Sequence, residues 1–170
     1  MLANEPGVRI PETLPAEVIA VFDARLADEY SAYYFYRNAA NWCKNMNYKK
    51  AAAFFEAETI TELEHAAGLQ NYLIQFNLMP EIPTVPTNVN FASLIDIINA
   101  AYELEYDLYL KYSADQNALD KVHASSFNFI QKYTKFQTKS IAEYSDLLNA
   151  LQLISVENKF DVLYFEQTYF

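Results

Sequence analysis

Four segments of the chain carry apolar residues at steps of three and four, and a polar group interrupts each apolar stripe near its middle. This spacing predicts four long helices, because residues three and four apart share one face of a helix. The interrupting groups, in chain order, are Glu29; Glu62 with His65; Glu105; and Gln137. A helix buries its apolar stripe, so the pattern predicts a helical bundle whose core contains carboxylates. With two Gly and six Pro in 170 residues, the chain is predicted to be all-α and to form one domain.

The breaks between the stripes predict how the helices are bounded. Residues 1–16 contain Gly7 and three of the prolines, so we expect an irregular N-terminal extension that ends where Pro15 can occupy the first turn of a helix. The bundle is expected over residues 17–155. A short turn near Asn47, a plausible cap for the next helix, predicts that the first two helices are antiparallel neighbours.

A long crossover is predicted between the second and third helices. Residues 77–90 contain Pro80, Pro83 and Pro86, which exclude helix and favour an extended chain. An extended segment of this length spans at most about 46 to 50 Å, and a helix of some 27 residues is about 40 Å long. The segment can therefore return along the whole bundle, which makes the second and third helices parallel.

The C-terminal part carries two further predictions. A polar junction around residues 115–120 is expected to separate the third and fourth helices. Residues 156–170 are predicted to form a short fifth helix with Phe160, Leu163 and Tyr164 on one side. A helix this short and apolar is unstable alone, so it should pack against a neighbour.

The composition indicates which kinds of binding partner the protein can have. A net charge of -10 argues against nucleic acid, since phosphate binding needs clustered Lys and Arg, and favours cations. The single cysteine, Cys43, cannot form an internal disulfide and is expected to be a small buried residue. The sequence shows neither a signal-peptide pattern nor a run of about 18 apolar residues typical of a membrane span. We therefore expect a soluble cytoplasmic protein with no membrane partner.

The interrupted stripes predict a metal centre. An unpaired buried carboxylate costs several kcal/mol, and no Lys lies on these stripes to compensate the charge. Glu62 and His65 are three apart and can reach one ion. We assign a first position to Glu29, Glu62 and His65, and a second to Glu62 and Glu105, with Glu62 as the bridge. This ligand set suits iron, manganese or zinc.

Two further side chains are assigned supporting roles around the metal centre. Gln137 can hydrogen-bond a metal-bound water or oxygen species, and Tyr36 can hydrogen-bond a ligand or supply an electron.

Four other polar residues are open to a functional and a structural interpretation. Glu58 either extends the metal path or meets a tyrosine hydroxyl, and the second interpretation is favoured. His123 is expected to be a surface or capping residue rather than a ligand. Asp115 and Asp120 either line an ion access route or are solvated residues at a helix junction, the commoner case.

Four segments resemble, in order and spacing, the ferroxidase segments of ferritins, over residues 17–165. They are ADEYSAYYFY at 27–36, ELEH at 62–65, YELE at 102–105 and QTKSIAE at 137–143. The segments AAAF at 51–54 and NWC at 41–43 add similarity to bacterial ferritins.

The resemblance implies a ferritin-like four-helix bundle with a short fifth helix, in a subunit of a hollow cage that commonly contains 24 chains. It implies that two Fe(II) ions per subunit are oxidised by O2 or peroxide and stored as a ferric mineral, without haem. Carried over, Glu29, Glu62, His65 and Glu105 become the iron ligands, with Tyr36 and Gln137 beside them.

The sequence also departs from the family pattern. It has KFQTKS at 135–140 where bacterial ferritins often carry an acidic cluster, so a third iron site is not expected and the centre is closer to that of animal heavy-chain ferritin. Lys135 and Lys139 are expected to weaken iron capture nearby. Two alternatives stay open: an iron-binding shell subunit with little catalysis, and a di-iron oxidase or peroxidase of rubrerythrin type. The absence of a second Glu-x-x-His motif argues against the rubrerythrin type.

Overall fold

The computed structural model describes residues 9–86 and 90–170, and in these ranges the secondary structure consists of five α-helices. The remaining residues of the predicted N-terminal extension and of the crossover lie outside the described part. The helices are α1 (Ala16–Asn45), α2 (Lys49–Gln75), α3 (Leu94–Leu119), α4 (Ala124–Leu151) and α5 (Lys159–Tyr169). The predicted all-α class is confirmed. None of the helices in the described ranges is both long enough and apolar enough to cross a membrane.

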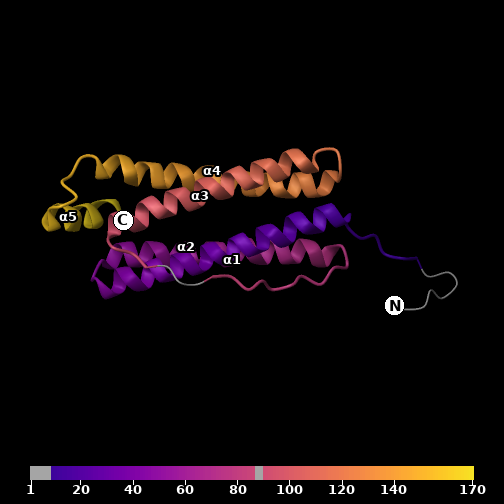
Figure 1. Cartoon of the computed structure of the whole chain (residues 1–170), viewed down its shortest axis with the longest axis horizontal. Coiled ribbons are helices and arrows are strands. Elements are labelled where there is room, and N and C mark those ends of the chain that lie inside the picture. Colours follow the sequence, from indigo (N-terminus) through magenta and orange to yellow (C-terminus); the bar gives the residue numbers. More distant parts are fainter. Residues whose placement is uncertain (1–8, 87–89) are drawn as a thin grey trace.

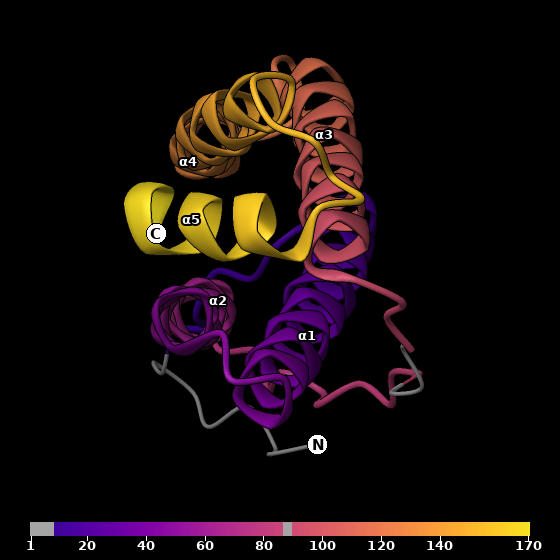
Figure 2. The same cartoon turned by 90° about the vertical axis from the view of Figure 1, so that its left-hand side faces the viewer.

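The four long helices form a bundle of two antiparallel pairs, α1 with α2 and α3 with α4 (Figure 1). The chain after α2 runs back along the bundle, so that α3 starts at the end where α2 starts, and the predicted parallel arrangement of α2 and α3 is confirmed (Figure 1). Viewed from the end, the four helices surround a common core, and α5 lies crosswise over that end (Figure 2).

Asparagines in the left-handed backbone region end the first two helices. Asn47 has φ 63°, and the amides of Asn47 and Tyr48 donate to the carbonyls of Lys44 and Cys43. Asn77, with φ 61°, ends α2 by the same pair of hydrogen bonds. Asn tolerates this conformation better than most residues other than Gly. Asn47 therefore terminates α1 and does not cap α2, as its sequence position had suggested.

Side-chain caps fix the starts of the later helices. Ser93 accepts a hydrogen bond from the amide of Asp96 at the start of α3. His123 does the same for α4, where its Nδ1 accepts from the amide of Ser126 at 3.3 Å, so the predicted capping role of His123 is confirmed. The junction before α4 is shorter than predicted. Asp115 lies inside α3 and pairs with Arg25 at 3.5 Å, which allows the helix to continue to Leu119.

The fifth helix packs through a face other than the predicted one. Val162, Phe165 and Glu166 are buried, whereas Phe160 and Tyr164 are 73% and 59% exposed. Glu166 accepts hydrogen bonds from the amides of Lys50 and Ala51, at 2.7 and 3.1 Å. The helix α2 has no side-chain cap of its own, so this carboxylate from α5 satisfies its free amides and complements its dipole. The short helix is thereby fixed to the end of the bundle.

Candidate metal centre

Glu29 from α1 meets Glu62 and His65 from α2 inside the bundle. The ligand atoms of these three residues all lie within 4.8 Å of one another. His65 Nδ1 is 3.4 Å from an oxygen of Glu29 and 3.4 Å from an oxygen of Glu62. Both carboxylates are almost fully buried. The three side chains predicted to form the first metal position are therefore together in the structure.

A second group shares Glu62 and adds Glu58 from α2 and Glu105 from α3. Its ligand atoms also lie within 4.8 Å of one another. The sequence predicted Glu62 and Glu105 here, and both are present. Glu58 is an addition, because the preferred interpretation had assigned it to a tyrosine hydroxyl. Glu62 belongs to both groups, which is the arrangement required of a bridging carboxylate.

The carboxylates cannot all carry their charge in this interior without a compensating cation. Burial raises the pKa of Glu105 to about 8, even though a hydrogen bond from Tyr36 opposes the change. Burial also raises the pKa of Glu62 well above its usual value, while His65 acts in the opposite direction. Burial lowers the pKa of His65, but Glu29 and Glu62 outweigh this effect and raise it to about 10. The raised pKa values of Glu62, Glu105 and His65 favour their protonated forms in the metal-free chain.

Several buried polar atoms have no hydrogen-bond partner in the part of the chain that the structure describes. Among them are one oxygen each of Glu29, Glu62 and Glu105, the Nδ1 of His65, and both amide atoms of Gln137. An unsatisfied buried polar atom costs about 1–3 kcal/mol, and more if the group is charged. Carboxylate oxygens and imidazole nitrogen are ligands for divalent iron, manganese and zinc, so the residues present fit such ions.

Two tyrosines donate hydrogen bonds to carboxylates of the centre, each across from α1 to α3 or from α3 to α1. Tyr36 of α1 donates a hydrogen bond to Glu105 of α3, and Tyr112 of α3 donates one to Glu29 of α1. Each tyrosine follows a Glu of its own helix by seven residues, two helical turns, and contacts the Glu of the other helix. Burial raises the pKa of both hydroxyls well above 10, so both remain protonated donors. The two hydrogen bonds orient the carboxylates that face the metal positions.

Gln137 lies on α4, the helix that brings no carboxylate or imidazole to either group. Its side chain is fully buried. Nearby, the ring of Tyr144 stacks on Tyr36 with centroids 6.2 Å apart, and its hydroxyl is buried. These groups bound the interior from the α4 side and offer donors and acceptors to whatever occupies it.

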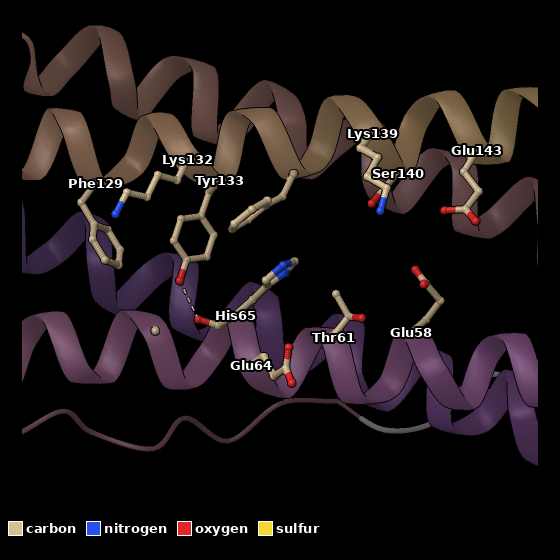
Figure 3. Close-up of a pocket in the computed structure, with 12 residues that line it drawn as sticks. Glu58, Thr61, Glu64, His65, Phe129, Lys132, Tyr133, Lys139, Ser140 and Glu143 are labelled. Carbon is tan, nitrogen blue, oxygen red and sulfur yellow. Dashed lines mark hydrogen bonds between the residues drawn. The ribbon is translucent and has the colours of Figure 1, made fainter.

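A pocket of about 440 Å³ opens between α2 and α4 beside the centre. His65 points into the gap between the two helices, and the hydroxyl of Tyr133 donates to the carbonyl oxygen of His65 at 2.8 Å (Figure 3). The ring of Phe136 stacks on His65 with centroids 4.9 Å apart. These contacts hold the imidazole between the pocket and the buried carboxylates.

The other sequence candidates have structural roles. Asp115 is paired with Arg25, which favours the structural interpretation over an ion access route. Asp120 is exposed at the end of α3. Cys43 is a free, buried residue, as predicted, and burial raises the pKa of its thiol to about 12.

Sequence reasoning missed Tyr112 as a partner of Glu29. The available signal was the repeat of Glu and Tyr seven apart in both α1 and α3, at Glu29 with Tyr36 and at Glu105 with Tyr112. For Glu58 the signal was its position four residues before Glu62, on the same helix face.

Comparison with known proteins agrees with this architecture. A family model described as a ferritin-like domain matches residues 19–154. Bacterial non-heme ferritin of Campylobacter jejuni is 27% identical over 145 residues, covering 83% of this chain and 86% of the relative. A probable bacterial non-heme ferritin-like protein of Haemophilus influenzae is 22% identical over 148 residues, covering 86% and 90%.

A solved structure described as a humanized archaeal ferritin has the same fold, with a TM-score of 0.84 and 17% sequence identity. The match covers 92% of this chain and 96% of that one. The domain match spans most of the chain, and it coincides with the four helices that surround the carboxylate centre. The chain therefore belongs to the ferritin family.

Proposed function

We propose that the protein is an iron-storage ferritin subunit that oxidises Fe(II) at the buried centre. The observation that carries this proposal is the pair of ligand groups that share Glu62, inside a bundle whose core is mostly apolar. Glu29 and His65 complete the first Fe(II) position, and Glu105 contributes to the second. Iron is here the substrate and the stored cargo, two ions per subunit.

The chain's own residues supply charge and proton handling for the reaction. Two Fe(II) ions lose one electron each, and O2 takes both electrons and two protons to leave as hydrogen peroxide. Peroxide is an alternative oxidant, which takes the two electrons and two protons to give water. Hydrolysis of Fe(III) to the oxyhydroxide then releases protons. Three ionised carboxylates offset much of the cations' charge. The pKa values of Glu62 and Glu105 are raised, so iron capture displaces protons from these two residues.

Tyr36 and Gln137 are proposed to act beside the iron rather than on it. Tyr36 orients Glu105 through its hydrogen bond, and it is the redox-active side chain nearest that ligand. The amide of Gln137 has no hydrogen-bond partner among the described residues, so it is available to a water or oxygen species on the iron.

The uncovered face of α5 supports assembly into a cage. Phe160, Leu163 and Tyr164 are 73%, 47% and 59% exposed in the single chain, and apolar side chains gathered on one short helix are typical of subunit contacts. We propose a closed shell of 24 copies, the commonest size in the family. Leu163→Asp should yield smaller species in sedimentation velocity while the far-ultraviolet circular dichroism spectrum stays helical. An unchanged shell would contradict a contact through this face.

Aerobic oxidation of Fe(II) by the purified protein tests the catalytic proposal. Glu62→Ala and His65→Ala should each slow the initial rate by at least about 10-fold, because each removes a ligand. Glu64→Ala is the matched control: Glu64 is exposed on the same helix, so its removal should leave the rate unchanged. Equal rates in Glu62→Ala and wild type would refute the assignment.

The alternative hypothesis, a shell subunit with little catalysis, rested on the expectation that the second metal position has few protein ligands. The proximity of Glu58 to Glu62 and Glu105 weakens this argument, because three carboxylates are available at that position. Normal shell assembly with oxidation no faster than that of Glu62→Ala would favour the alternative. A dimer in native mass measurement would instead revive the rubrerythrin-type hypothesis.

A further inference from the structure

Two members of the ligand groups line the pocket, His65 and Glu58, and Glu58 is the carboxylate of the pair. Glu58 is also only partly buried. It lies one helical turn before Glu62 on α2, so its side chain emerges from the same face of the helix. It is half-buried, whereas Glu62 and Glu105 are 1% and 0% exposed. The carboxylate therefore stands between the sealed interior and the open space between α2 and α4.

On the inner side, Glu58 completes a group that lacks sufficient partners. Glu62 and Glu105 each keep one oxygen without a hydrogen bond among the described residues, and Gln137 keeps both amide atoms free. A ligand oxygen of Glu58 lies within 4.8 Å of those of Glu62 and Glu105. Three oxygens from two helices at this separation can share one divalent ion, and the buried unpartnered oxygens require such an ion or protons.

On the outer side, Glu58 faces charged groups of α4. Glu58 and Glu143 extend toward each other across the gap between the helices, and Lys139 extends into the same gap (Figure 3). Both residues of α4 interact electrostatically with Glu58, with opposite signs. Both also line the pocket of about 440 Å³. A cation that leaves the buried group by way of Glu58 therefore meets one attractive and one repulsive side chain.

We propose that Glu58 is the third carboxylate ligand of the second metal position, and that divalent ions exchange with that position through the pocket between Glu58 and Glu143. The inference deepens the proposed function and rests on it. Lys139 restrains the exchange by repelling the ion, and Glu143 promotes it. The first position reaches the pocket only through His65, and the ring of Phe136 stacks on that imidazole, so its ion should exchange more slowly.

Equilibrium binding of Zn(II) to the metal-free full chain tests the ligand role. Wild type should bind two ions per chain. Loss of a hydrogen-bonding partner of a metal ligand already weakens binding by about 10–100-fold, so Glu58→Gln, which removes a ligand, should weaken the second ion at least about 10-fold. The first ion should be unaffected. Glu64→Gln is the control, because Glu64 lines the same pocket but belongs to neither ligand group.

Stopped-flow uptake of Co(II) tests the exchange route. Glu143→Gln should slow uptake of the second ion and Lys139→Gln should speed it, with both differences shrinking at high salt. Equal uptake rates in the two variants would overturn the route. An unchanged second affinity in a helical Glu58→Gln would overturn the ligand role, and Glu58→His, which offers a nitrogen, should restore much of the affinity. If the wild-type chain binds fewer than two Zn(II) ions, and Glu62→Gln binds as many ions as the wild type, the result contradicts the proposed function rather than the role of Glu58.

Discussion

The metal-free protein should lose stability as the pH rises, and Glu105→Gln should remove much of that loss. The pKa of Glu105 is about 8 in the folded chain, compared with 4.5 for an ordinary Glu. A group whose pKa is raised by folding contributes stability that is fully present below its unfolded pKa and disappears as the pH passes the folded one. For Glu105 this window runs from about pH 4.5 to about pH 8. The raised pKa of His65, about 10, acts with the same sign at higher pH.

The size of the effect follows from the two pKa values of Glu105. The interval from 4.5 to 8 corresponds to about 5 kcal/mol of unfolding free energy, at about 1.4 kcal/mol per pH unit. No discount for solvent screening applies, because the side chain is 0% exposed. About 4 kcal/mol of this falls between pH 5 and pH 9. For a chain of this size each kcal/mol shifts Tm by about 2–4 °C, so the wild type should lose about 8–16 °C more than Glu105→Gln over that range. The Gln keeps an oxygen that can accept the hydrogen bond from Tyr36.

Thermal unfolding of both proteins, extensively chelated and at one protein concentration, measures this difference. Saturating Zn(II) should abolish most of the wild-type loss, because the cation favours the ionised carboxylates over the protonated ones. Parallel Tm curves for metal-free wild type and Glu105→Gln would refute the reasoning. They would mean that the buried carboxylate is already compensated in the metal-free chain.

Two further predictions concern the contacts that hold the centre and the bundle end. Tyr112→Phe removes the hydrogen bond to Glu29, so the first Zn(II) should bind about 10-fold more weakly, whereas Tyr106→Phe, at an exposed position, should leave a binding titration unchanged. Glu166→Ala leaves two amides of α2 uncapped and should lower the unfolding free energy by about 1–2 kcal/mol. Glu157→Ala, at an exposed position, should leave the unfolding free energy unchanged. Equal denaturation midpoints for Glu166→Ala and wild type would contradict the capping role.

The fold could be predicted from the sequence because helical periodicity and proline placement are local signals. The apolar stripes give the helices, and Pro80, Pro83 and Pro86 give the crossover. The errors arose where tertiary contacts decide. Asp115 resembles a junction residue in the sequence, yet Arg25 of another helix neutralises it and α3 continues. The packed face of α5 is set by Glu166 reaching the start of α2, a contact between residues more than a hundred positions apart.

The candidate site could be predicted in part for the same reason. Glu29, Glu62, His65 and Glu105 are visible because a carboxylate or imidazole on an apolar stripe is locally anomalous. Glu58 is less visible, because other polar residues of α2, such as Glu56, Thr61 and Glu64, lie close to it in the sequence. The sequence does not say which of them are sealed from water. Whether Glu58 contacts a tyrosine or a second metal position depends on where α3 brings Glu105.

The two proposed metal positions differ in a way that suits different tasks. The first is built from Glu29, Glu62 and His65, with Phe136 stacked on the imidazole and Tyr112 holding Glu29, so an ion there is enclosed on several sides. The second depends on Glu58, which is half-buried and faces the pocket. An enclosed position retains its ion, and an open one allows turnover. Because Glu62 belongs to both groups, each departure from the open position changes the charge around the enclosed one. Coupling of this kind predicts that chelators remove the second ion first and that the first then becomes harder to remove, since Glu62 is left to serve one ion.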